Sequence, residues 1–178
     1  MLFHLPKFPA EIRVSHLNAR LNEQRKKIAQ ATSSRVELLQ WMQQLVKEAK
    51  ARKKNDQKIF VLDFKGDIQA SAADTLREEI TLILATAKAG HDRVVVRLES
   101  PGGMVHGYGL AAAQLVRLRD AGFNLTICVD KVAASGGYMM ACIANEIISA
   151  PFAVVGSIGV VAQVPNFNRL TPAFKSSK

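Results

Sequence analysis

The sequence predicts an α/β protein in which a layered parallel sheet with helices is preceded by a basic helical segment. From Lys58 onward, short apolar runs typical of strands alternate with segments typical of helices, and this alternation favours parallel pairing with helices packed on the sheet. Before that point the chain is polar and basic, since residues 1–58 hold 13 Lys and Arg against five Asp and Glu. The net charge of +9 therefore belongs mainly to the first segment.

The basic segment is expected to form two helices within residues 15–54. Apolar side chains recur at loose helical spacing in the first helix, and a Thr-Ser-Ser break follows it. Ser34 and Glu37 have the spacing of a capping box that starts the second helix, whose apolar stripe runs to about Ala51.

A segment of this composition has three interpretations: a soluble helical stalk, a contact with anionic lipid headgroups, or a contact with nucleic acid. Proteins that track a nucleic-acid backbone commonly add stacking aromatic side chains, and Trp41 is the only large one among these charges. We therefore expect no nucleic-acid partner.

The second part of the chain supplies the strands and helices of the sheet. Its strands are expected at 59–64, 93–98, 124–129, 147–149 and 154–161. Its helices are expected from a cap at Ser71 and Asp74 to about Lys88, from the loop after Gly103 to about Asp120, and from about Ser135 to Ala144. Residues 147–168 are uncharged over a membrane-spanning length, but their prolines and glycines favour strand–turn–strand over a membrane helix.

Three loops follow predicted strands, at the edge where open α/β sheets place their ligands: 99–103, 130–137 and 155–159. The first contains Pro101-Gly102-Gly103, whose backbone N–H groups no side chain shields. Such a run is either a plain tight turn or a set of main-chain donors for an oxyanion.

Ser135, followed by Gly136-Gly137 inside an apolar stretch, also has two interpretations. It is either the N-cap of the next helix or a nucleophile, with glycines that let a substrate backbone approach. The run is not the Gly-x-Ser-x-Gly elbow of the α/β-hydrolases, because Ala133 stands where the first glycine belongs.

Other candidate sites are weaker. Residues 107–112 fit Gly-x-Gly-x-x-Ala, and Asp130 lies at the distance expected of a dinucleotide fingerprint, yet eight residues separate Leu98 from Gly107. His106 is a conceivable base, but no acidic residue is placed to orient it. No cluster of Asp, Glu, His and Cys suggests a metal, and we expect neither metal nor cofactor.

Three motifs in order carry a family resemblance. RLESPGGMVHGYG at 97–109, DKVAASGGY at 130–138 and PFAVVGSIGVV at 151–161 resemble the SohB branch of the signal peptide peptidase A serine proteases. The resemblance covers about residues 58–170. It implies a ClpP/crotonase-like fold, a homo-oligomer, and cleavage of peptides or membrane-protein remnants by a serine–lysine dyad at the inner membrane, on its periplasmic side.

On that resemblance Ser135 is the nucleophile, the backbone N–H groups of Gly103 and Gly136 form the oxyanion hole, and the Ser157 hydroxyl positions the lysine. The domains expected are a basic helical segment at 1–57, a partial protease domain at 58–170 and a non-matching polar tail at 171–178.

The family's lysine lies further along than this chain extends, and neither Lys175 nor Lys178 matches its motif. We therefore expect a truncated or frameshifted form, with the domain C-terminally incomplete. No membrane-spanning helix is readable. The alternatives are a catalytically inactive interaction subunit, a crotonase-like acyl-CoA enzyme that needs no serine, and the dinucleotide-binding protein.

Overall fold

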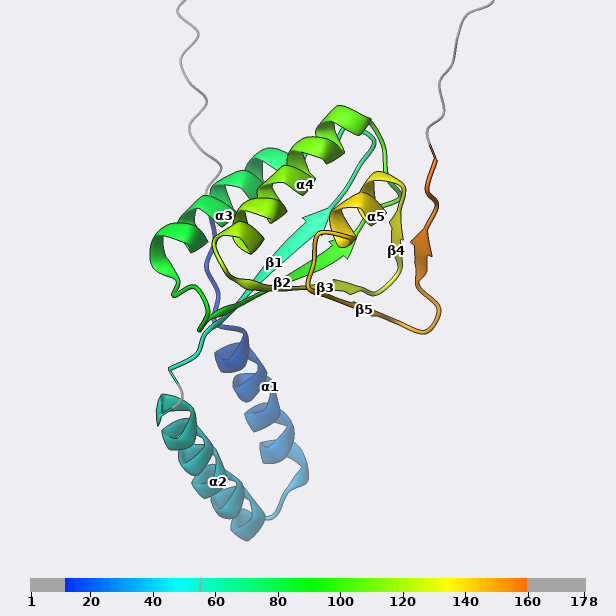
Figure 1. Cartoon of the computed structure of the whole chain (residues 1–178). Helices are drawn as coiled ribbons and strands as arrows, with labels where there is room; N and C mark the ends of the chain where they lie inside the picture. Colours follow the sequence, from blue (N-terminus) through cyan, green and yellow to red (C-terminus); the bar gives the residue numbers. More distant parts are fainter. Residues whose placement is uncertain (1–11, 55, 160–178) are drawn as a thin grey trace, which may run out of the picture.

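The chain begins with a helical hairpin and continues into an α/β layer (Figure 1). The structure is a computed structural model that describes residues 12–54 and 56–159. The predicted tail at 171–178, with Lys175 and Lys178, and the end of the predicted strand at 154–161 lie outside the described residues.

The hairpin consists of α1 (Leu17–Thr32) and α2 (Arg35–Lys54), so the two predicted helices are confirmed. The capping box is also present: the Ser34 N–H donates to the Glu37 carboxylate at 2.7 Å. No residue of α1 is buried. The exposed large apolar side chains of the hairpin are Leu17, Leu21, Ile28, Val36, Leu39, Met42 and Val46.

A four-stranded parallel sheet forms the centre of the second part. Its strands are β1 (Ile59–Lys65), β2 (Arg93–Glu99), β3 (Asn124–Val129) and β5 (Glu146–Ser149), in the spatial order β1-β2-β3-β5. Two short strands, β4 (Val132–Ala134) and β6 (Val154–Gly156), pair in parallel as a second, smaller sheet. The predicted α/β class with parallel strands is confirmed.

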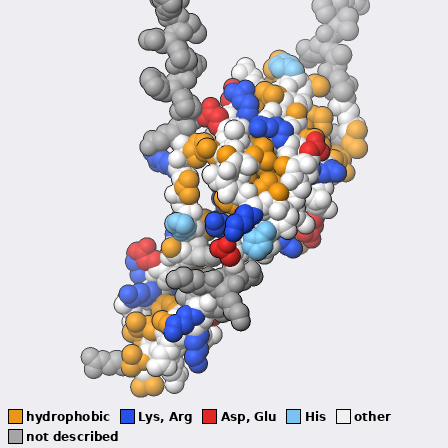
Figure 2. Space-filling model, turned by 60° about the vertical axis from the view of Figure 1, so that its left-hand side comes forward, with side chains coloured by type: hydrophobic (Ala, Val, Ile, Leu, Met, Phe, Trp, Pro, Cys, Tyr) orange, Lys and Arg blue, Asp and Glu red, His pale blue; other side chains and the backbone are white. Residues whose placement is uncertain are grey.

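The helices α3 (Ala73–Thr86), α4 (Val105–Asp120) and α5 (Gly136–Ala141) lie on one side of the larger sheet (Figure 1). The core lies between them and the sheet, and its fully buried members include Phe64, Leu76, Ile80, Val94, Val96, Leu98, Leu115, Leu118, Leu125 and Ile127. Burial of each such side chain contributes about 2 kcal/mol relative to exposure. Figure 2 shows basic and apolar side chains interspersed over the hairpin at the bottom of the view, apart from this core.

Two predicted boundaries are wrong for a local reason. Ser71 does not cap α3, because the helix begins two residues later, after Ala72, without a side-chain cap; the Ser71 N–H donates instead to the Asp67 carboxylate at 2.9 Å, within the preceding turn. The predicted helix at 135–144 is only six residues long. After the helix, the Asn145 N–H donates to the Leu125 carbonyl and the Asn145 side-chain oxygen accepts from the Leu125 N–H. These two bonds place the chain beside β3, where β5 begins at the next residue.

Candidate active site

Ser135 lies in a strained turn between β4 and α5. Its backbone has φ 52° and ψ −117°, a region that residues other than glycine rarely adopt. Its side chain makes no capping hydrogen bond, and the residue is half-buried. Ser135 therefore does not cap the helix through its side chain. Although Ala133 breaks the elbow sequence pattern, the chain still makes a strand–serine–helix turn of the kind that presents a nucleophile.

The two glycines after Ser135 are required by packing. A Cβ on Gly136 would overlap the Tyr108 ring, and one on Gly137 would lie 2.9 Å from both the Cβ and the carbonyl oxygen of Ser100. Because no side chain fits at either position, the backbone of α5 packs directly against α4 and the end of β2. This contact fixes Ser135 relative to both.

The Pro-Gly-Gly turn lies directly against Ser135. Gly102 has φ +88°, and a Cβ on it would lie 2.6 Å from the Ser135 Cβ and 3.0 Å from the Gly136 nitrogen. The Gly102 N–H donates to the Ser100 Oγ at 3.0 Å, whereas the N–H groups of Gly103 and Gly136 have no acceptor among the residues that the structure describes. Two unpaired backbone donors thus come from the two loops that meet at the serine.

The third predicted loop reaches the same place. The Ser135 N–H donates to the Gly156 carbonyl at 2.9 Å, and Ala134 lies opposite Gly156 in the β4–β6 register. Ser157 follows directly after the end of β6, is exposed, and has φ 58°. The structure therefore brings together all four residues that the sequence singles out; their chemical roles remain predictions.

The placement of Gly107 and Gly109 does not fit a dinucleotide fingerprint. Gly107 and Gly109 lie inside the first two turns of α4, not in a loop between a strand and a helix. A Cβ on Gly107 would lie 2.6 Å from the Gln69 carbonyl oxygen, so this glycine serves helix packing. His106, on the same helix, is exposed, and its side chain makes no hydrogen bond among the described residues.

Two side chains near the turn carry no role in the sequence argument although both are fully buried. Ser100 and Tyr108 share a hydrogen bond of 2.6 Å directly behind the Pro-Gly-Gly turn. The only signal in the sequence is a serine before a Pro-Gly-Gly run and a tyrosine between two glycines. Neither pattern shows that the two side chains meet.

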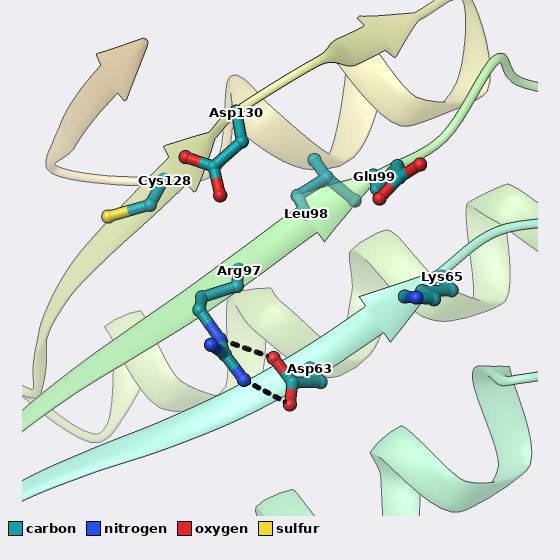
Figure 3. Close-up of a pocket in the computed structure, with 7 residues that line it drawn as sticks. All are labelled: Asp63, Lys65, Arg97, Leu98, Glu99, Cys128 and Asp130. Atoms are coloured by element: carbon teal, nitrogen blue, oxygen red, sulfur yellow. Dashed lines mark hydrogen bonds and ion pairs between the residues drawn. The ribbon is translucent and has the colours of Figure 1, made fainter. Parts of the chain in front are cut away.

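An open cleft of about 330 Å³ lies on the sheet face opposite the helices, and none of the four predicted site residues lines it. Figure 3 shows its lining residues, Asp63, Lys65, Arg97, Leu98, Glu99, Cys128 and Asp130. The Arg97 guanidinium pairs with both Asp63 carboxylate oxygens at 2.5 Å, and the Lys131 amine binds Glu99 at 3.0 Å. Both are exposed ion pairs, one across β1 and β2 and the other between β2 and the loop after β3, and such pairs typically contribute less than about 1 kcal/mol each.

Comparison with known proteins decides the family. The model of "Peptidase family S49 N-terminal" matches residues 6–115, and that of "Peptidase family S49" matches residues 117–174. The chain belongs to peptidase family S49. The expected resemblance is thereby confirmed, and it assigns the chain to a family of proteases.

The S49 chain is 64% identical over 118 residues to "Probable protease SohB" of Buchnera aphidicola subsp. Acyrthosiphon pisum, an alignment that covers 66% of this chain and 35% of that protein. It is 66% identical over 112 residues to "Probable protease SohB" of Haemophilus influenzae, covering 63% of this chain and 31% of that protein. The chain thus spans about a third of the length of these curated relatives.

The solved structures to which the chain is similar include that of a ClpP1 mutant from Listeria monocytogenes. It aligns with 52% of the S49 chain and 50% of its own chain, at 14% identity and a TM-score of 0.35. No helix within residues 12–54 and 56–159 is long and apolar enough to cross a membrane.

Proposed function

We propose that this S49 chain carries the nucleophile and the oxyanion-binding groups of a SohB-type serine endopeptidase. The observation that carries the proposal is the conformation of Ser135: a strained, half-buried serine whose hydroxyl has no partner among the described residues and whose neighbours offer two unpaired N–H groups. Strain at a residue other than glycine costs roughly 1–3 kcal/mol, persists only where the surrounding structure enforces it, and clusters at active sites.

The proposed reaction is acyl transfer to the serine. The Ser135 Oγ attacks the carbonyl carbon of a peptide bond, and the developing oxyanion accepts hydrogen bonds from the Gly103 and Gly136 N–H groups. The serine proton passes to a neutral lysine and then to the leaving amine. Water hydrolyses the acyl-enzyme and restores the serine.

The base of this proposal is the family's lysine, held by the Ser157 hydroxyl. A lysine accepts a proton at neutral pH only when it is desolvated enough to be uncharged. None of the lysines that the structure describes makes a hydrogen bond to Ser135, and the chain covers only about a third of its relatives. We propose that the lysine that serves Ser135 lies outside the described residues.

The proposal extends to the substrates, the oligomeric state and the cellular location of the protease. We expect extended, apolar peptides such as remnants of membrane proteins, cleaved by a homo-oligomeric protease at the inner membrane, on its periplasmic side, without a cofactor. Assembly with further protein is supported by the exposed large apolar side chains on and next to β5 and β6, which are Ile147, Ile148, Phe152, Val154, Val155 and Ile158.

The test is covalent labelling of the purified chain with a fluorophosphonate, followed by mass spectrometry of its peptides. Labelling at Ser135 that Ser135→Ala abolishes is the expected result. A folded chain that shows no labelling would contradict the proposal and favour the inactive interaction subunit. Turnover of an acyl-CoA that survives in Ser135→Ala would favour the crotonase-like enzyme instead.

A further inference from the structure

Behind the Pro-Gly-Gly turn, four groups form a continuous chain of hydrogen bonds. The Gly102 N–H lies 3.0 Å from the Ser100 Oγ, which lies 2.6 Å from the Tyr108 Oη, which lies 2.7 Å from the Asp67 carbonyl oxygen. The chain links the turn after β2 to the first turns of α4 and to the loop after β1.

The direction of every bond in this chain is fixed by its two ends. A backbone N–H only donates and a carbonyl only accepts, so Gly102 donates to Ser100 and Tyr108 donates to Asp67. Because the single phenolic proton is committed to Asp67, the Ser100 hydroxyl must donate to Tyr108. Each hydroxyl thus donates one hydrogen bond and accepts one, so none of the four linked groups lacks a partner.

The two hydroxyls are also held sterically. Both side chains are fully buried, and a Cβ on Gly66 would overlap the Tyr108 hydroxyl and lie 2.5 Å from the Ser100 Oγ. On the other side, a Cβ on Gly137 would lie 2.9 Å from the Ser100 Cβ. Burial raises the pKa of the Tyr108 phenol, so the phenol keeps its proton and the chain keeps its direction at neutral pH.

The hydrogen-bond chain also restricts the backbone on one side of Gly103. The residue before it is anchored by the bond from Gly102 to Ser100, and the residue after it is anchored by the Met104 N–H, which donates to the Ile68 carbonyl at 2.7 Å. Between these anchors the Gly103 N–H has no acceptor among the described residues, and a Cβ added to Gly103 would overlap the Ile68 carbonyl. Because the Gly102 N–H already donates to Ser100, the Gly103 N–H is the donor of this turn that can face a substrate.

We propose that Ser100 and Tyr108 are positioning residues that orient the Gly103 N–H for the oxyanion, acting through the backbone of Gly102. This inference rests on the proposed protease function. An oxyanion donor contributes on the order of 10²–10³ in rate, and a misplacement of about 1 Å forfeits much of that. Neither side chain touches the substrate in this arrangement.

The first test compares the fluorophosphonate labelling rate of Ser135 in the full chain with that in Ser100→Ala and Tyr108→Phe. Ser100→Ala frees the Gly102 N–H, and we expect the maximal rate constant to fall about 10–100-fold with the dissociation constant of the probe unchanged. Tyr108→Phe leaves the Ser100 acceptor in place, and the fall should be about 3–10-fold. The double variant should be little slower than Ser100→Ala, because both act through one chain.

Thr126→Val is the matched control, since it removes a hydroxyl from a strand position that is only 9% exposed and lies outside the turn. It should label at the wild-type rate. A folded Ser100→Ala that labels at the wild-type rate, or a loss that appears only in the dissociation constant, would overturn the inference. If Ser100→Ala does not fold, Tyr108→Phe alone decides by the same criteria.

The second test does not depend on activity. Amide hydrogen exchange, resolved by NMR, should accelerate at Gly102 and Met104 in Ser100→Ala, while the amides of β2 and β3 exchange as in the wild type. Unchanged exchange at Gly102 would overturn the inference even if the wild type labels. A wild type that does not label, with accelerated exchange at Gly102 in the variant, would contradict the protease proposal and leave the positioning of the turn supported.

Discussion

At the scale of single residues, the site depends on a serine in a conformation suited to glycine. The backbone of Ser135, at φ 52°, is held by its N–H bond to Gly156 on one side and by the close packing of Gly102 on the other. The surrounding loops therefore maintain a strain that the residue itself does not relieve.

Replacing Ser135 tests that strain. Ser135→Ala and Ser135→Gly both remove the hydroxyl, but only glycine adopts this backbone without strain. Strain relief of roughly 1–3 kcal/mol outweighs the greater freedom of glycine in the unfolded chain, so we expect Ser135→Gly to be more stable than Ser135→Ala by about 1 kcal/mol. Urea unfolding measures the difference; an alanine variant as stable as the glycine variant would show that the turn is not strained.

Two glycines provide a matched pair for the packing of the turn. Gly102→Ala forces a side chain onto φ +88° and against Ser135, and should destabilise the fold by roughly 2–3 kcal/mol. Gly109→Ala adds a methyl group in open space inside α4 and should stabilise the fold by about 0.5–1 kcal/mol. Thermal unfolding of both variants checks the prediction, which fails if the two substitutions have similar effects.

At the scale of elements, Asp92 ties together the start of β1, the end of α3 and the start of β2. It is 2% exposed, and its carboxylate accepts from the Lys58 N–H at 2.9 Å and from the Lys88 N–H at 2.8 Å. These backbone hydrogen bonds, that from Lys88 first, hold the pKa of Asp92 below its ordinary value of 3.8.

A depressed carboxyl pKa stabilises the folded state above the ordinary pKa, and this stabilisation is lost as the pH falls through the lowered folded-state value. At about pH 7, Asp92→Asn should cost about 2 kcal/mol, because the amide offers one acceptor where the carboxylate offers two. At about pH 3 the difference from wild type should be smaller, since part of the wild-type advantage is then lost.

Urea unfolding at the two pH values provides the measurement. Asp56→Asn is the control, because the Asp56 carboxylate makes its 2.9 Å contact with the exposed Lys88 amine only. It should be nearly neutral at both pH values. A cost of Asp92→Asn that does not change with pH would contradict the role assigned to its charge.

The elements themselves differ in how far the sequence predicts them. β1, β2 and β3 are runs of β-branched and apolar residues bounded by turn residues, so their local pattern is sufficient. β4 has no such pattern, because Val132-Ala133-Ala134 is short and alanine-rich. It is a strand because Ser100 bridges to Ala133 and β6 pairs along it, contacts that only the folded chain creates.

Some features of the candidate site are likewise predictable from the sequence, and others are not. Glycine runs and strand ends predict that the loops of Ser135, Gly103 and Ser157 meet, because parallel strands place their carboxyl ends at one edge. The Ser100–Tyr108–Asp67 chain is not predicted, because it joins residues eight and 41 positions apart by burial and hydroxyl geometry. The spacing of residues along the sequence does not indicate such a contact.

At the scale of the whole molecule, the hairpin and the α/β layer should differ in stability. The apolar side chains of α1 and α2 are largely exposed, whereas β1–β3 enclose a buried core against α3 and α4. Helices without tertiary burial are only marginally stable in water.

Hydrogen exchange followed by mass spectrometry should therefore show amides of 17–54 exchanging well before those of β2 and β3 in the full chain. Equal protection of the two parts would mean that the hairpin buries its apolar side chains in solution, for example against a second copy of the chain. Measuring exchange at several protein concentrations separates these cases, because protection by a second copy rises with concentration.

The central claim is that Ser135 and two backbone N–H groups form one acyl-transfer site. A crystal structure of the phosphonylated chain tests it most directly. We expect phosphorus bonded to the Ser135 Oγ, with one phosphonyl oxygen about 2.7–3.1 Å from the nitrogens of both Gly103 and Gly136. An adduct on another residue, or an oxygen directed away from both nitrogens, would contradict it.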